Sequence, residues 1–148
     1  MAFSKQDLRL MDLLLARIDH PAYVVDKDFK IVYINEFCRH ITFYDRDVQG
    51  MCLFDAFQDL RHDNSVVAHV MRTGTAEVES LDFWTSITGE KRVSLASAYP
   101  IIEDGEVIGV FEMAEPLSNL DQGFRSQLMQ QGIPHLISSV KAAPGETY

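Results

Sequence analysis

The sequence of 148 residues predicts an α+β domain with a five-stranded antiparallel sheet, short helices on one face of the sheet, and a further helix at each end of the chain. Two observations lead to this fold class. Two short runs rich in Val, Ile and Tyr flank an acidic turn within Pro21–Asn35. Three longer strand-like runs joined by tight turns then follow a series of short helical segments.

The composition limits the class of protein. A hydrophobic content of 47% excludes a disordered chain, and no apolar run is long enough to cross a membrane. The N-terminal residues MAFSKQDLRL have no signal-peptide pattern, which predicts a cytoplasmic protein whose two cysteines are free thiols. The net charge of −9 argues against nucleic acid binding by this segment, because contact with phosphates needs a basic surface.

The first predicted helix covers Ser4–Ile18, and Ser4 with Asp7 three positions later is typical of a capped helix start. One apolar strip has the spacing of a coiled-coil seam and consists of Leu8, Met11, Leu15 and Ile18, with Leu13 extending it; a second consists of Leu10 and Leu14. A helix that is apolar on more than one side must be covered more than once. We therefore predict that residues 1–18 form a homodimerisation helix through the seam; the alternative is a lid on its own sheet.

The central hairpin pairs Ala22–Asp26 with Lys30–Ile34, and Asn35 caps the helix that follows. Strict alternation places Ile31 with Tyr33 on one face of the sheet, and Val32 with Ile34 on the other. The remaining predicted helices are Asn35–Phe43, Asp55–Leu60 and Val66–Arg72, the last of them capped by Asn64 or Ser65 and stopped by Gly74. The remaining predicted strands are Glu77–Thr85, Arg92–Tyr99, ended by Pro100, and Glu106–Ala114.

Several of these motifs, taken in order, resemble a PAS domain over about Leu14–Ala114. They are Pro21-x-x-Val24-Val25-Asp26, Ile31-x-Tyr33-Ile34-Asn35, Gly50 before an apolar pair, Arg72-Thr73-Gly74, and Pro100-Ile101 with Gly105 and Ile108-Gly109-Val110. The resemblance implies a sensor domain at residues 19–115 that responds to a small molecule, a cofactor or a partner protein. Residues 116–148 would then be a linker towards an output domain.

The last predicted strand, Gly109–Ala114, is similar to the sensor domains of bacterial enhancer-binding activators that serve the nitrogen-type (sigma-54) factor, the arginine-utilisation regulators among them. That similarity implies an ATPase module and a DNA-binding helix-turn-helix downstream in the full-length protein. The closing residues Gly145–Tyr148 resemble the approach to such a module, which favours a fragment cut at a domain boundary. A histidine kinase output is left open.

The predicted ligand pocket centres on Ser94, Ala96 and Ala98, which are small residues on one face of a central strand. Arg92 and Tyr33 would add polar groups, and Phe111 takes the position at which flavin-binding PAS domains carry a glutamine. These residues predict a site for a small metabolite. The alternative is a tightly packed face, in a module that binds only other proteins.

Enzymatic activity and cofactors find little support in the sequence. We find no phosphate-binding loop, nucleophile elbow or metal-ligand spacing. Flavin photosensors carry Gly-x-Asn-Cys-Arg-Phe, whereas here Cys52 in Gly50–Phe54 falls one position early, so we expect no flavin. His69 lies on the helix that holds the haem ligand in haem-binding PAS sensors, and a haem-based redox or gas sensor is therefore an alternative function.

Overall fold

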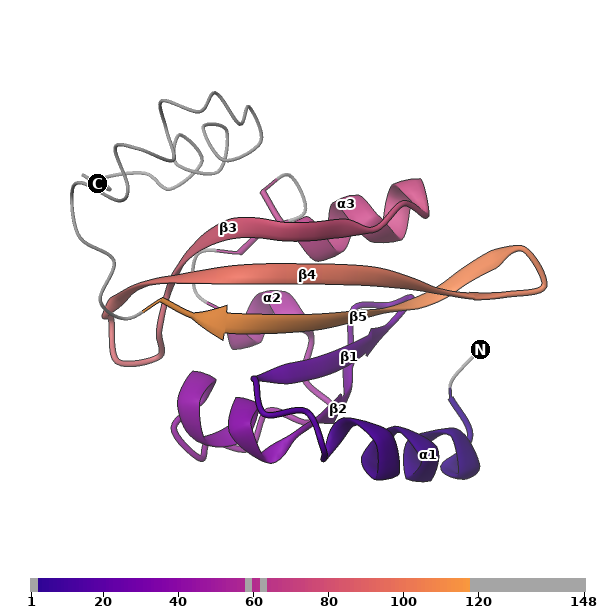
Figure 1. Cartoon of the computed structure of the whole chain (residues 1–148), viewed down its shortest axis with the longest axis horizontal. Helices are drawn as coiled ribbons and strands as arrows, with labels where there is room; N and C mark the ends of the chain where they lie inside the picture. Colours follow the sequence, from indigo (N-terminus) through magenta and orange to yellow (C-terminus); the bar gives the residue numbers. More distant parts are fainter. Residues whose placement is uncertain (1–2, 58–59, 62–63, 118–148) are drawn as a thin grey trace.

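The computed structural model describes residues 3–57, 60–61 and 64–117 (Figure 1). The elements are α1 (Lys5–Leu15), β1 (Ala22–Asp26), β2 (Ile31–Ile34), a π-helix (Cys38–Thr42), α2 (Leu53–Ala56), α3 (Val66–Thr73), β3 (Glu77–Thr85), β4 (Lys91–Glu103) and β5 (Glu106–Pro116). The five strands form one antiparallel sheet in the order β2-β1-β5-β4-β3. The predicted fold class is confirmed, whereas the predicted C-terminal helix lies outside the described residues.

The hydrophobic core lies between the sheet and the segment that connects β2 to β3. Figure 1 shows this segment, with α2 and α3, passing across one side of the sheet. The buried cluster draws on strands and helices alike and comprises Tyr23, Val25, Ile31, Ile34, Cys38, Phe43, Val48, Leu53, Ala56, Val67, Val70, Ala98 and Val110. Among the described residues, no helix is both long and apolar enough to span a bilayer.

Local signals placed the start of α1 and both ends of α3 correctly, whereas α1 ends at Leu15 before the predicted Ile18, and α2 covers Leu53–Ala56 instead of Asp55–Leu60. The Ser4 hydroxyl accepts a hydrogen bond from the Asp7 amide and the Asp7 carboxylate accepts one from the Ser4 amide, so the predicted capping pair is present. Ser65 caps α3 by accepting from the Ala68 amide, and Gly74 ends that helix in the left-handed conformation at φ 68°. Glycine adopts this conformation at no steric cost because it has no Cβ atom.

Asn35 is the residue that joins α1 to the sheet. Its side-chain oxygen accepts from the amides of Ala22 (3.0 Å) and Cys38 (2.9 Å), which confirms the predicted helix cap. Its amide group donates to the carbonyl of His20 at 2.8 Å, and to those of Leu15 and Ile18 at 3.4 Å. The side chain, 2% exposed, thus ties the end of α1, the start of β1 and the π-helix together.

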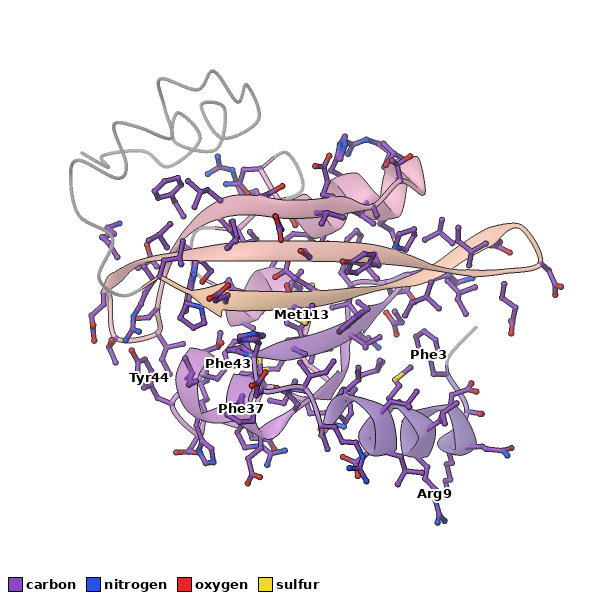
Figure 2. All side chains as sticks on the ribbon, in the orientation of Figure 1. Phe3, Arg9, Phe37, Phe43, Tyr44 and Met113 are labelled. Atoms are coloured by element: carbon purple, nitrogen blue, oxygen red, sulfur yellow. The ribbon has the colours of Figure 1, made fainter. Side chains whose placement is uncertain are left out.

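Helix α1 packs on the domain with one side and leaves the other open. None of its residues is fully buried, but Leu8, Met11, Leu15 and the nearby Ile18 are half-buried. Phe3 folds back towards the sheet while Arg9 points away from it (Figure 2). The exposed apolar residues are Leu10, Leu13 and Leu14, at 56%, 58% and 60%. The seam predicted for dimerisation is therefore the side already partly covered within one chain.

Two strand predictions are wrong. The first fails because of a backbone irregularity, and the second because Pro100 lies beyond Ala98, the last residue that β4 pairs with β3, so that the strand has an edge there that tolerates proline. The pairing of β1 with β2 shifts between Val24 and Val25, so that Ile31 joins the core while Tyr33 bonds Asp12 of α1 at 3.3 Å. A bulge of this kind reverses the alternation of side chains. Pro100 does not end β4, which continues to Glu103 past a second shift between Ile101 and Ile102.

Candidate functional site

The two faces of the sheet carry different parts of the predicted pocket. Directly paired residues of antiparallel strands share a face, and Tyr33, Val24, Phe111 and Tyr99 form one such row across β2, β1, β5 and β4. The rings of Tyr99 and Phe111 stack at 6.0 Å within that row. Because β5 alternates, Glu112 lies on the opposite face, towards the core.

The core-facing row next to it contains Tyr23, Glu112 and Ala98, and the Tyr23 hydroxyl donates to the Glu112 carboxylate at 2.8 Å. Ala96 and Ser94 follow on the same face of β4, as does Arg92. Four of the six predicted pocket residues therefore share the core face, whereas Tyr33 and Phe111 lie on the other face. The prediction that all six residues line a single pocket is therefore wrong, because they lie on opposite faces of the sheet.

A group of polar side chains surrounds Ala96, which is fully buried. Ser80 of β3 is paired directly with Ala96, and Asp82 is paired with Ser94, one row further along β4. Glu112, paired with Ala98, lies one row to the other side. We call Tyr23, Ser80, Asp82 and Glu112 the polar cluster. It brings an acidic residue from β3 and another from β5 to either side of the same alanine.

Burial keeps both carboxyl groups of the polar cluster difficult to ionise. Desolvation raises the pKa of Glu112 well above its usual range, and the nearby Asp82 carboxyl raises it further, while the hydrogen bond from Tyr23 acts in the opposite direction. Desolvation also raises the pKa of Asp82. The pKa of Tyr23 is raised by burial and by Glu112. Glu112 is therefore mostly protonated near neutral pH, whereas Asp82, with a pKa raised to about 7, is only partly protonated.

Aromatic rings form the wall beside the polar cluster. The ring centroid of Phe57 lies 5.1 Å from that of Phe43, 6.4 Å from that of Tyr23 and 5.7 Å from that of Trp84. The rings of Phe57 and Trp84 meet edge to face. The Trp84 indole also donates to the Ser94 hydroxyl at 3.1 Å. A site with a few convergent polar groups beside apolar rings is the usual make-up of a small-molecule site.

The amino-acid sequence matches the PAS fold family over residues 15–122. The chain belongs to that family. It is 24% identical over 120 residues to the transcriptional activator RocR of Bacillus subtilis (strain 168), covering 80% of this chain but 26% of RocR. The chain thus spans about a quarter of that relative's length.

Solved structures share the fold of this PAS domain at low sequence identity. The LOV protein of Rhodobacter sphaeroides is similar with a TM-score of 0.64 and 9% identity, over 95% of this chain and 82% of that one. VqmA bound to DPO is similar with a TM-score of 0.57 and 17% identity, over 74% of this chain and 57% of that one. These likenesses show the fold of the domain.

His69 of the PAS domain does not lie where an internal haem ligand is needed. Its side chain is 46% exposed, with one ring nitrogen 3.3 Å from the Glu77 carboxylate and the other 3.3 Å from the Arg72 guanidinium. Both nitrogens are thus engaged at the surface, so these residues do not fit an axial haem site. Cys52, the position compared with flavin photosensors, is half-buried.

Sequence reasoning missed the polar cluster. Glu112 stands at an inward position of β5 between apolar neighbours, in the run GVFEMA, and Asp82 stands between Leu81 and Phe83. An acidic residue at an inward strand position was the available signal. Its meaning depends on the pairing of β3, β4 and β5, which the sequence does not show.

Proposed function

We propose that this chain is the small-molecule-sensing PAS domain of a bacterial transcription activator, acting as a cytoplasmic homodimer and not as an enzyme. The alignment with RocR supports the regulatory context, and VqmA bound to DPO offers a precedent for a ligand in this fold. The ATPase and DNA-binding modules of the full-length protein would be the output, reached through residues 116–148.

The observation that carries the sensor function is the polar cluster itself. Glu112 is 6% exposed and Ser80 is 2% exposed, although the surrounding core is apolar. Buried polar groups without full compensation reduce the stability of a domain. Their presence beside small residues supports a site for a small molecule, rather than the ligand-free interaction module that was the alternative.

Replacing Ala96 by Phe tests the location of the site. We expect the Phe side chain to occupy the position between the polar side chains and to abolish ligand-induced thermal shifts, in a screen of amino acids and small carboxylates. Val78→Phe is the matched control, because Val78 is 55% exposed on β3. The interaction module would be favoured by three results together: Ala96→Phe fails to fold, Ala96→Val folds, and no compound shifts the melting temperature of the native domain.

The exposed leucines of α1 support a homodimer in which Leu10, Leu13 and Leu14 pair with a second copy about a two-fold axis. Leu10→Glu with Leu14→Glu is expected to give a monomer by sedimentation while the circular dichroism of the sheet remains, because like charges would meet in an apolar contact. Lys27→Gln with Arg46→Gln changes the net charge equally at exposed positions outside α1, and should leave the dimer intact. A native protein that sediments as a monomer at micromolar concentration contradicts the proposal.

A further inference from the structure

The two carboxyl groups of the polar cluster have no cationic partner among the described residues. Burial is the whole cause of the raised pKa of Asp82, and at Glu112 a second carboxyl adds to burial. No basic side chain of the described residues offsets either effect. The nearest basic side chain along β4 is Arg92, whose guanidinium bonds the Tyr44 hydroxyl and lies 3.4 Å from the Glu90 carboxylate. Buried Glu112 and half-buried Asp82 therefore lie to either side of Ala96 with no compensating cation among the described residues.

The Ser80 hydroxyl is a third polar group of the cluster that is not compensated by any described residue. The Ser80 hydroxyl is buried and has no hydrogen-bond partner among the described residues. Ser80 is paired directly with Ala96, between the rows of Asp82 and Glu112. Buried hydroxyl groups are nearly always bonded in native proteins. An incoming group at this place meets two carboxyl groups and a hydroxyl, all of which can accept hydrogen bonds.

The geometry points to the polar cluster as the binding site for the charged nitrogen of a small organic ammonium compound, an inference that rests on the sensor function proposed above. The ammonium group donates to the Asp82 and Glu112 carboxylates and to the Ser80 hydroxyl, which together match its three donors. The rings of Phe57 and Trp84 beside the cluster suit a short apolar chain on the same ligand.

A metal ion is a poorer occupant of this position. No group of three or more His, Cys, Asp or Glu side chains that would hold a metal occurs in the described part of the chain. Calcium and magnesium would need several waters or further oxygen ligands beside two carboxyl groups and a hydroxyl, which a largely buried position does not favour. An organic cation needs only hydrogen-bond acceptors and apolar contact, both of which the cluster offers.

Binding of a cation should release protons. The groups that face Glu112 are Tyr23 on β1, Asp82 on β3 and Cys38 on the π-helix, and none of them is basic. A cation favours the ionised carboxylates, so the protons that they hold near neutral pH pass to the buffer. Calorimetry in two buffers of different ionisation enthalpy measures this release.

The test uses n-butylammonium, with n-butanol and butyrate as probes of similar shape and different charge. Trp84 is the only tryptophan of the sequence and stands beside the cluster, so its fluorescence reports binding. We expect n-butylammonium to change that fluorescence saturably, raise the melting temperature and release protons. Glu112→Gln and Asp82→Asn should each weaken binding about ten- to hundred-fold, because each removes one charge-assisted hydrogen bond.

Glu115→Gln is the matched control, since Glu115 lies on the same strand as Glu112 but is exposed. It should bind n-butylammonium as the native domain does. A response to n-butanol or butyrate equal to that to n-butylammonium would overturn the ammonium assignment while leaving a sensor in place. Equal binding of n-butylammonium by the native domain and both cluster variants would do the same. Absence of any response to n-butylammonium also overturns it, whereas the sensor function itself fails only if no compound of the wider screen shifts the melting temperature of the native domain.

Discussion

Asn35→Asp is expected to destabilise the domain by about 3 kcal/mol, because it replaces a buried donor by a charge. The new carboxylate keeps the bonds from the Ala22 and Cys38 amides, but its second oxygen faces the His20 carbonyl, now 2.8 Å from the amide nitrogen. Two oxygen atoms at that distance repel each other. The melting temperature in calorimetry should fall by about 10 °C at neutral pH.

The loss of stability caused by Asn35→Asp should become smaller as the pH falls, because a protonated carboxyl group regains one donor for the carbonyl of His20. Hydrogen exchange should show that the amides of residues 15–20 lose protection first, since Asn35 holds this segment to the hairpin. Gln49→Glu is the control: this exposed amide donates to the Val32 carbonyl at 3.1 Å, and its loss should change stability by less than about 0.5 kcal/mol. Equal effects of the two substitutions would show that Asn35 is not the joint between α1 and the sheet.

The second large effect is a loss of stability with rising pH that Glu112 causes. Its pKa is about 8 in the folded domain against 4.5 for a solvated side chain, so the folded state binds more protons between these values. The contribution of Glu112 is then fully present below about pH 4.5 and is lost as the pH rises through about 8. We expect native stability to fall by more than about 1.4 kcal/mol over this range, the equivalent of one pKa unit.

Glu112→Gln should reduce this pH dependence, leaving the part that the raised pKa of Asp82 contributes, and make the domain more stable than the native protein at pH values near 8. The amide oxygen of Gln can still accept from the Tyr23 hydroxyl, so the variant keeps the one hydrogen bond seen at this carboxyl. Glu115→Gln, which changes an exposed carboxyl on the same strand, should leave the slope unchanged. Urea unfolding at a series of pH values gives the comparison, and parallel curves for native and Glu112→Gln would contradict it.

The sequence by itself determined the order and type of the elements, because those signals are local. The Ser4–Asp7 pair, the Ser65 cap and Gly74 act within a single turn of chain, and all three are found where they were predicted. The tight turn at Gly105, with φ 78°, is a similar case. Motifs spread over residues 21–110 then sufficed to identify the fold class, since their order reflects that of the strands and helices.

Only the tertiary structure decided which residues face one another. A shift of pairing between Glu77 and Ser80 sets which β3 side chains face the core, and a one-residue change would turn Ser80 and Asp82 outwards. The approach of Asp82 to Glu112 follows from β4 lying between β3 and β5, not from any spacing along the chain. In the same way, the half-burial of Leu8 and the exposure of Leu10 depend on how α1 docks, since either apolar strip suits a helix of this sequence.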